Sequence, residues 1–498
     1  MLHLALFWSH SEEVLKGSRL SPGIEVELCK SWTSPNNDKP QIQKDTANES
    51  TTLRRLTQLK EHLPKGTTMS VSVTAKGFQD ISSMIQKYDR DWKFEGACSS
   101  QLVQKERVVV TGTTGALGSH LLSQLLSNDK IEKVWAMNRR SSKENRERQI
   151  ASFRDKLLDE NLLKDEKLVF VDADLESLKL GLGDDMYNEI RAEATIIIHN
   201  AWEVSLSLNL KSFEPNIHGA RNLLDLAFCS SAQTGPPRFV FASSITVAGF
   251  SRPGSRLNEA PVALEDAANT IGYGQSKLVT EKLLESARRA GLQTCIARIG
   301  QLSGDIKSGS WSTTDWVPSL ISTSVSLGYL PEAAGVVSWL PLDVAATSII
   351  DTCVARNIDL PLVVHVSHPR PVPWMDILEA LSTAIASRTG SNLPIIHFDE
   401  WNKALTRTSA SLGELKRKRY AMFPITRIKN LVNRAVQVDN ELRSAKSTTG
   451  AEFSGLVSLD TTVAESLSEA LRSTPQLGAE HVDKWVWYWE SIGLFKSF

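Results

Sequence analysis

The chain has 498 residues, of which 41% are hydrophobic and 23% charged, with a formal net charge of -1. Such a chain can bury a large core, and its balanced charge argues against a nucleic-acid partner. Five scattered cysteines without Cys-x-x-Cys pairing argue against a disulfide framework and a structural zinc site: Cys29, Cys98, Cys229, Cys295 and Cys353. The apolar start lacks a basic flank, and no later apolar run could span a bilayer, so a cytoplasmic protein is predicted.

The N-terminal region, residues 1–100, has no clear domain pattern. Residues 31–61 are polar and predict a loop or linker. Leu53–Leu63 and Phe78–Tyr88 have helical apolar spacing, and we expect both to pack against the domain that follows.

From Arg107 onward, short apolar runs alternate with helical stretches, which predicts a doubly wound parallel sheet of the Rossmann type over residues 101–300. The expected strands are Val108–Val110, Val134–Met137, Leu168–Val171, Thr195–His199, Phe239–Ala242 and Thr294–Arg298. Residues 301–498 mix helices, such as Trp316–Leu327 and Trp374–Ile385, with short strands, such as Leu362–Val366. They predict a smaller α+β substrate lobe, interleaved with the core sheet.

A glycine-rich turn joins the first predicted strand to an apolar helix. It reads Thr111-Gly112-Thr113-Thr114-Gly115-Ala116-Leu117-Gly118, with the Gly-x-x-Gly-x-x-Gly spacing of short-chain reductases. Glycine lets the backbone approach a pyrophosphate, and a helix N-terminus attracts its charge. We therefore expect Thr111, Gly112, Thr114, Gly115, Ala116, Leu117 and Gly118 to bind a dinucleotide, although such a motif alone is weak evidence.

The second strand ends in Asn138-Arg139-Arg140, where an acidic residue would indicate NAD. Arg139, together with Arg148 on the next helix, predicts a contact with the phosphate of NADPH; a solvated basic turn is the alternative. By position, Asp174 and Leu175 after the third strand would reach the adenine. Asn200 and Ala201 after the fourth would lie near a ribose.

Tyr273 and Lys277 are one helical turn apart and face the same way. A nearby ammonium lowers the pKa of a phenol and makes it a usable proton donor, while the same lysine can hold the nicotinamide ribose. Ser244, with Ser243 as the less favoured choice, could bond the substrate oxygen. Asn216 could hold a relay water or the lysine, or could simply satisfy the backbone. These residues together predict carbonyl reduction.

With these residues placed, residues 107–342 closely resemble the terminal thioester reductase domain of fungal non-ribosomal-peptide-synthetase-like enzymes, which are extended short-chain reductases. The shared segments are the glycine turn, His199-Asn200-Ala201-Trp202, Phe213-Glu214-Pro215-Asn216, Tyr273-Gly274-Gln275-Ser276-Lys277, Ala297-Arg298-Ile299-Gly300-Gln301, Asp315-Trp316-Val317-Pro318 and Trp339-Leu340-Pro341-Leu342-Asp343. The resemblance departs at Glu203-Val204-Ser205-Leu206-Ser207, where the family often has Val-Asp-Phe-Asn.

This resemblance implies that NADPH reduces an acyl thioester on a phosphopantetheinyl carrier protein to an aldehyde, with Tyr273 as proton donor. Phe78–Tyr88 resembles the linker helix that follows a carrier. Because neither an adenylation core nor a Gly-x-Asp-Ser carrier signature is present, we expect action in trans. Reduction on to an alcohol stays open.

Two other functions stay open. One is reduction or epimerisation of a free ketone or nucleotide sugar in the same fold. The other is an inactive NADP-binding protein, which the intact Ser244, Tyr273 and Lys277 disfavour. In the C-terminal region, Lys416–Arg419 is a solvated helix face or a surface for an acidic carrier, and Trp485, Trp487 and Trp489 predict packing of the last helix onto the body.

Overall fold

The computed structural model describes residues 68–92, 103–248, 255–267, 270–411, 420–444, 450–455 and 457–495. All of them belong to one compact unit, residues 66–498. The predictions for residues 31–61, Leu53–Leu63, Lys416–Arg419 and two of the cysteines, Cys29 and Cys98, lie outside the described residues. Within the described residues, no helix is both long enough and apolar enough to cross a membrane.

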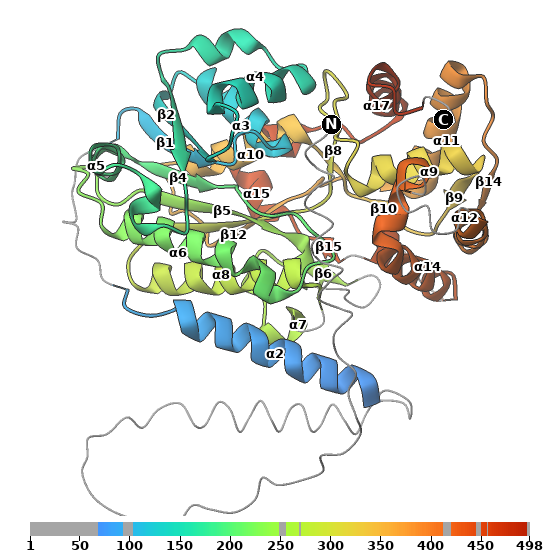
Figure 1. Cartoon of the computed structure of the whole chain (residues 1–498), viewed down its shortest axis with the longest axis horizontal. Coiled ribbons are helices and arrows are strands. Elements are labelled where there is room, and N and C mark those ends of the chain that lie inside the picture. The colour runs from blue at the N-terminus through green and yellow to red at the C-terminus, as the bar shows by residue number, and fades with distance from the viewer. Residues whose placement is uncertain are drawn as a thin grey trace, which may run out of the picture. The chain divides into compact units, whose positions relative to one another are not determined.

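A seven-stranded sheet forms the centre of the fold (Figure 1), and all its neighbouring strands are parallel. Its strand order is β12-β7-β5-β4-β1-β2-β3. The strands are β1 (Glu106–Thr111), β2 (Ile131–Arg139), β3 (Leu168–Ala173), β4 (Ile196–His199), β5 (Arg238–Ser244), β7 (Thr294–Ile299) and β12 (Val363–Val366). The order reverses between β1 and β4, and such a reversal opens a ligand crevice at the carboxyl ends of the strands. The predicted doubly wound fold is confirmed.

The strands are apolar on both faces because helices cover both sides of the sheet. Val109 in β1 packs into one core cluster, and its neighbours Val108 and Val110 pack into the other. One face is covered by α2 (Thr68–Tyr88), α5 (Asp184–Glu193), α6 (Glu214–Phe228) and α8 (Gly272–Arg289). The other is covered by α3 (Ala116–Leu126), α4 (Asn145–Asp155), α10 (Leu342–Val354), α15 (Thr462–Leu467) and α16 (Glu469–Ser473).

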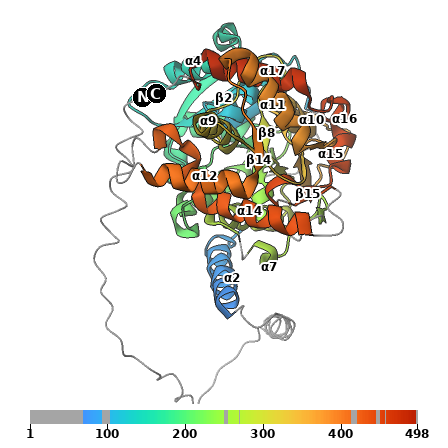
Figure 2. The same ribbon diagram turned by 90° about the vertical axis from the view of Figure 1, so that its right-hand side faces the viewer.

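The second lobe lies beside the carboxyl ends of the strands and is seen face on in Figure 2. Its helices are α9 (Trp316–Leu327), α11 (Trp374–Thr389), α12 (Phe398–Ser411), α14 (Lys429–Ser444) and α17 (Ala479–Ser491). Short strands pair within it or join it to the loops of the main sheet: β6 (Arg256–Leu257), β8 (Leu302–Ser303), β9 (Leu330–Glu332), β10 (Val336–Val337), β11 (Leu340–Pro341), β13 (Val372–Pro373), β14 (Ile395–His397) and β15 (Ser458–Leu459). The expected helices at 316–327 and 374–385 are therefore present.

Tryptophan rings form the centre of this lobe. Trp311 contacts Trp339 and Trp485 edge to face, with ring centroids 5.6 and 5.0 Å apart. Trp485 and Trp489 are buried, so they pack α17 onto the body as expected. Trp487 is 46% exposed, and the expectation was wrong for this residue because it lies on the solvent side of α17.

The two lobes share chain segments. After β11 the chain returns to the main sheet, where α10 packs on α3 and β12 pairs with β7. The expected strand at 362–366 is therefore the edge of the main sheet. The domain boundary at residue 300 stays a prediction. The strand β12 shows that a segment after this position belongs to the main sheet.

The end of α2 is fastened to the main body, with α2 running alongside α7 (Leu264–Ala267) and α8 (Figure 1). Glu214 at the start of α6 accepts hydrogen bonds from Lys87 and Tyr88. The guanidinium of Arg221 donates to the carbonyls of Tyr88 and Arg90. The helix expected at Phe78–Tyr88 is thus present, begins ten residues earlier, and ends close to the N-terminus of α6.

Candidate active site

The glycine turn between β1 and α3 is packed too tightly for side chains at two of its three glycines. Gly112 has φ 73°, and a Cβ there would lie 2.8 Å from the Cα of Ala201. A Cβ at Gly118 would lie 2.0 Å from the carbonyl oxygen of Gly112. Gly115 has a more open environment, and it caps α3 without a side-chain hydrogen bond. The first amides of α3, at Ala116 and Leu117, therefore face the turn without a side-chain cap, which fits a pyrophosphate.

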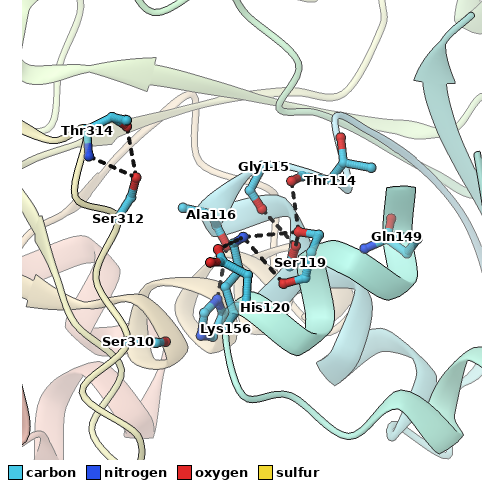
Figure 3. Close-up of polar contacts among 12 residues, drawn as sticks. Thr114, Gly115, Ala116, Ser119, His120, Gln149, Lys156, Ser310, Ser312 and Thr314 are labelled. Carbon is cyan, nitrogen blue, oxygen red and sulfur yellow. Dashed lines mark hydrogen bonds and ion pairs between the residues drawn. The ribbon is translucent and has the colours of Figure 1, made fainter. Parts of the chain in front are cut away.

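Hydroxyl groups hold this turn from behind (Figure 3). The Ser119 hydroxyl lies 2.8 Å from the carbonyl oxygen of Gly115 and 3.0 Å from that of Thr113, and its one hydrogen is shared between them. Ser152 on α4 donates to the carbonyl of Thr114 at 2.9 Å. The turn is therefore preorganised by the protein itself, so a ligand would not have to order it.

Thr111 joins the ends of β1 and β4 at the sheet's reversal point. Its Oγ1 accepts hydrogen bonds from the amides of Asn200 and Ala201, at 3.1 and 2.9 Å. The hydroxyl hydrogen of Thr111 can then be donated to Nδ1 of His199, 3.0 Å away. Burial lowers the pKa of His199 to about 3, so this imidazole is neutral. The structure thus brings Asn200 and Ala201 against the glycine turn. Their expected contact with a ribose stays a prediction.

A buried polar network at the end of β2 was not predicted. The side-chain amide of Asn138 donates to Thr113 Oγ1 at 2.7 Å and to Asn145 Oδ1 at 2.9 Å. Gln149 accepts from Thr113 Oγ1 and donates to its carbonyl. The Asn138-Arg139-Arg140 motif therefore has two parts. Asn138 is buried and bonds to Thr113 in the glycine turn, whereas Arg139 and Arg140 are exposed to solvent.

The arginines expected to bind phosphate gather at the end of β2. Arg139 is exposed, and Arg148 donates to its carbonyl at 2.8 Å while lying 3.5 Å from Asp172 on β3. The Arg140 guanidinium instead donates to the carbonyl of Gly181. Arg139 and Arg148 are thus neighbours on the rim of the crevice, about one strand away from the glycine turn.

Asp174 and Leu175 follow β3, also on this side of the sheet. The carboxylate of Asp174 is exposed but accepts from the Ser177 hydroxyl at 2.5 Å and the Glu176 amide at 3.3 Å. Leu175 packs against α6, where a Cβ at Gly219 would lie 2.8 Å from its side chain. Their contact with an adenine stays a prediction.

Ser244 and Tyr273 form a hydroxyl pair at the mouth of the crevice. Ser244 ends β5 and Tyr273 is in the first turn of α8, where close backbone packing sets the position of the helix. A Cβ at Gly272 would lie 2.4 Å from the carbonyl oxygen of Leu208, and one at Gly274 would lie 2.5 Å from that of Thr246. Burial raises the pKa of Tyr273 to about 12, and the hydrogen bond with Ser244 acts in the opposite direction. Tyr273 therefore keeps its proton at neutral pH.

Lys277 lies one turn further along α8 and is surrounded by aromatic rings. Its Nζ donates to the carbonyl of Ala242 at 2.7 Å. The same atom lies 4.2 Å from the ring centroid of Trp202, 4.6 Å from that of Phe241 and 5.6 Å from that of Tyr273. Burial lowers the pKa of Lys277 well below its usual value, while the Glu281 carboxylate raises it.

The electrostatics of this pair differ from the sequence expectation. We expected the ammonium to lower the pKa of Tyr273, but Lys277 points to a carbonyl and to ring faces, and burial dominates both groups. The tyrosine is therefore held in its acidic, proton-bearing form. The rings of Trp202 and Phe241 were missed as part of the site, although Trp202 is in the His-Asn-Ala-Trp segment and Phe241 is three residues before Ser244.

The structure separates the roles of the two serines at the end of β5. Ser243 Oγ donates to Glu281 Oε1 at 2.5 Å, and Glu281 forms a fully buried ion pair with Arg298, at 2.8 Å. Ser244 Oγ instead accepts from the amide and hydroxyl of Thr246, at 3.2 and 2.9 Å, and pairs with Tyr273. The preference for Ser244 over Ser243 therefore has a geometric basis.

Asn216 is not joined to the hydroxyl pair by any contact that the described residues show. It lies half-buried in the first turn of α6, three residues after Phe213, whose ring packs edge to face on Tyr273 with centroids 6.0 Å apart. Its expected role in holding a water or Lys277 stays a prediction.

A small pocket lies beside the end of β5. Its lining residues are Ile245, Gln301, Trp316, Ser338, Trp339, Ser367, Glu452, Phe453, Val457 and Leu459. Ile245 directly follows Ser244, and most of the other lining residues belong to the second lobe. That this lobe binds the substrate stays a prediction.

Comparisons with known proteins agree with this fold. Residues 110–349 match the family described as Male sterility protein, a family of NAD-binding domains. The adenylate-forming reductase Nps11 of Serpula lacrymans var. lacrymans is 40% identical over 396 residues, which is 78% of this chain and 35% of that protein. The chain spans about a third of the length of the curated relatives it matches.

Solved reductase domains share the fold. The terminal R domain from the myxalamid PKS-NRPS biosynthetic pathway has a TM-score of 0.68 at 22% identity, covering 84% of this chain and 99% of that one. The R domain of a non-ribosomal peptide synthetase from Mycobacterium tuberculosis has a TM-score of 0.61 at 20% identity, covering 83% and 99%. The resemblance noted in the sequence is confirmed by the matched family of NAD-binding domains and by the adenylate-forming reductases to which this chain is similar.

Proposed function

We propose that the protein uses NADPH to reduce a carrier-bound acyl thioester to an aldehyde. The observation that carries the proposal is the paired hydroxyls of Ser244 and Tyr273, with the buried Lys277 one helical turn further along α8. A proton donor beside a second hydroxyl supports the reduction of a carbonyl, because both groups can bond the substrate oxygen.

The chain's residues divide the chemistry among them. Bound NADPH would supply the hydride. Ser244 hydrogen-bonds the thioester oxygen as negative charge develops there, and Tyr273 transfers its proton to that oxygen, which gives a hemithioacetal. The C–S bond then breaks, the hydroxyl hydrogen is lost, and the thiolate takes up a proton, leaving an aldehyde and a free thiol. Lys277 orients the nicotinamide ribose. Its ammonium group stabilises the negative charge that remains on Tyr273 after the proton has been transferred.

The proposed preference for NADPH rests on Arg139 and Arg148 at the end of β2. The guanidinium group of arginine matches the geometry of phosphate oxygens. The Arg148 guanidinium donates to the backbone carbonyl of Arg139, so Arg148 is held beside the end of β2. Arg139→Ala should raise the KM for NADPH about tenfold or more, the range for losing one hydrogen bond to a charged group, and should change the use of NADH little. The matched control is Arg146→Ala, which removes an exposed arginine of α4, the helix that carries Arg148. A wild-type preference for NADH would refute the assignment.

A thioester as substrate follows from the chemistry of hydride transfer, and we propose that a carrier protein acting in trans presents it. A free carboxylate resists hydride because addition would place a second negative charge on an anionic centre, whereas a thioester is neutral and has a leaving group. The name of the Serpula relative shows that acid activation and reduction can be combined in one protein, and the matched region is only part of it. In this chain we expect another protein to make the thioester.

The test compares one acyl group in four forms: on a carrier protein, on coenzyme A, as the free acid, and as the corresponding ketone. NADPH consumption should be most efficient with the carrier-bound form and absent with the acid, since carrier contacts add binding energy remote from the reacting carbon. Preferred reduction of the ketone or of a nucleotide sugar would favour the small-molecule alternative. NADPH binding without turnover of any of them would favour an inactive protein.

A further inference from the structure

Lys277 carries a buried amino group with few polar neighbours. The residue is 2% exposed, and its Nζ donates to the carbonyl of Ala242 at 2.7 Å. An ammonium group has three hydrogens to donate, and in the part of the chain that the structure describes this carbonyl is the one hydrogen-bond acceptor that Nζ meets. A buried charge in such surroundings is costly unless other groups stabilise it.

Two aromatic ring faces meet the same amino group. Its Nζ lies 4.2 Å from the ring centroid of Trp202 and 4.6 Å from that of Phe241. Both distances are within the limit of about 6 Å at which a ring face attracts a cation, and the attraction is stronger at a site without water than at the surface. We call the two rings the aromatic cage of Lys277.

The titratable groups around Lys277 come from α8, from β4 and, through an ion pair, from β7. Burial lowers the pKa of Lys277, and the Glu281 carboxylate of α8 acts against this, although it is already paired with Arg298 of β7, 2.8 Å away. Tyr273 on α8 keeps its proton because burial raises its pKa to about 12. His199 on β4 is neutral because burial lowers its pKa to about 3. The ring faces are therefore partners of the ammonium that no other cation has already paired.

The orientation of Trp202 is fixed by contacts on its other sides. Its indole N–H donates to the Ser276 hydroxyl of α8 at 3.3 Å. Its ring meets Phe241 edge to face at a centroid distance of 5.3 Å, and meets His199 in the same way at 5.9 Å. Trp202 therefore presents its ring to Lys277 with little freedom to turn away.

We propose that Trp202 is a positioning residue that, together with Phe241, keeps the amino group of Lys277 in its charged form. This inference rests on the proposed function, in which Lys277 holds the nicotinamide ribose and stabilises the charge left on Tyr273. A neutral amine would do both less well, because hydrogen bonds from an ionised donor are about twice as strong as those between neutral groups. The aromatic cage thus extends cofactor binding toward alkaline pH.

The first experiment measures NADPH binding to the full chain by cofactor fluorescence between about pH 6 and about pH 10, where a lysine of lowered pKa titrates. Trp202→Leu should move the alkaline weakening of binding to lower pH by about one unit or more, the equivalent of one cation–π contact without water. Trp202→Phe keeps a smaller ring face and should move it less. Lys277→Met should remove the alkaline weakening, which assigns it to this lysine.

The matched control is Trp487→Leu, which removes an exposed tryptophan of α17 and should bind NADPH as the wild type does at every pH. The same pH dependence in the wild type and in Trp202→Leu, including a Kd raised equally at every pH, would give Trp202 a packing role only and would overturn the inference.

A double-mutant cycle tests the contact without cofactor or turnover. At neutral pH, Trp202→Leu should raise the unfolding equilibrium constant about tenfold more in the wild type than in Lys277→Met, because the cation is absent from the second background. Tetrafluorotryptophan in place of Trp202 keeps the shape and the indole N–H but removes the negative potential of the ring face, so it should lose the same coupling. Equal effects in both backgrounds would overturn the inference.

The inference and the proposed function can fail separately. If no thioester is reduced but the cycle shows the coupling, the proposed function fails and the aromatic cage remains. If thioesters are reduced while the cycle shows no coupling, the aromatic cage fails and the proposed function remains.

Discussion

Tyr273 carries the largest share of the proposed chemistry, and its surroundings favour the acid over the phenolate. Its ring packs on Phe213, its hydroxyl pairs with Ser244, and burial raises its pKa to about 12. A tyrosine with a raised pKa keeps its proton throughout the neutral range but is a weaker acid than a free tyrosine. Proton transfer from Tyr273 would therefore depend on the negative charge that develops on the substrate oxygen.

Tyr273→Phe should reduce turnover by about a hundredfold or more, the effect of losing a positioned acid. The ring and its packing remain, so folding and NADPH binding should be unchanged. Tyr329→Phe, at a partly exposed position in the second lobe, is the control and should keep full turnover. Steady-state rates and cofactor titration check this, and near-normal turnover in Tyr273→Phe would show that another group is the acid.

The adjacent serines should give opposite phenotypes. Ser244→Ala should reduce turnover, because the hydroxyl proposed to bond the substrate oxygen is lost. Ser243→Ala should lower the free energy of unfolding by about 1–3 kcal/mol, since the buried carboxylate of Glu281 loses a donor. Its turnover per folded molecule should be close to that of the wild type. Denaturant titration and rates on both variants provide the test, and reversed phenotypes would exchange the two roles.

The candidate site residues that are close together in the sequence could be predicted from it. Residues that come together only in the folded chain were missed. Tyr273 and Lys277 follow from helical spacing, and Ser244 from its place at a strand end. The aromatic rings around Lys277 could not be predicted, because Trp202 follows β4, Phe241 is in β5, and the two rings meet only after these strands pair. Glu281 had a readable signal: it is four residues after Lys277 and so lies on the same face of α8.

The glycine turn is the element on which cofactor binding is proposed to depend, and its glycines are not equivalent. Gly118→Ala should be strongly destabilising, because its Cβ would lie 2.0 Å from a backbone oxygen that cannot move freely. Gly115→Ala should be tolerated far better, since its Cβ would lie 3.4 Å from its nearest neighbour and its φ is -78°. Thermal unfolding of the two variants checks this, and equal loss of stability would contradict the packing argument.

The strands were predictable because the parallel sheet is buried on both faces, which makes every strand an apolar run. Each predicted strand from β1 to β7 overlaps the observed one, and the errors are at the ends, where polar residues such as Glu106 and Arg238 continue the pairing. The network of Asn138, Thr113 and Gln149 was not predictable, because its members are isolated polar residues that meet only when β2 and α4 pack on the turn.

Across the whole molecule, buried histidines should make stability depend on acidity. Burial lowers the pKa of His368 to about 4, against the hydrogen bond from Nε2 to the carbonyl of Pro475. The Nδ1 atom accepts from the amide of Arg370, so the ring is held in its neutral form. An unfolded histidine binds its proton near pH 6.5. The stability from this residue is therefore complete above about pH 6.5 and is lost as the pH falls toward 4.

His368→Gln should flatten the fall in the free energy of unfolding between pH 6.5 and 4 by up to about 1.4 kcal/mol per pH unit, the value for one proton. The raised pKa values of Glu452 and Asp315, about 7 and 6, act in the opposite direction in the wild type, so the comparison must be made between variants. His397→Gln, at an exposed position, is the control. Urea titrations at several pH values test this, and parallel curves for wild type and His368→Gln would contradict it.

The position of β12 has a consequence for how such a protein can be divided. The chain leaves the main sheet after Ile299 and returns at Val363, where the backbone of β12 pairs with β7 along its whole length. A polypeptide ending near residue 300 would leave β7 as an unprotected edge, open to pairing with other chains and hence to aggregation. Part of the second lobe is thus an insertion between two strands of the main sheet, β7 and β12. Exchange of acyl-pocket segments between relatives should therefore succeed when the crossover points lie inside the lobe, with β12 left in place.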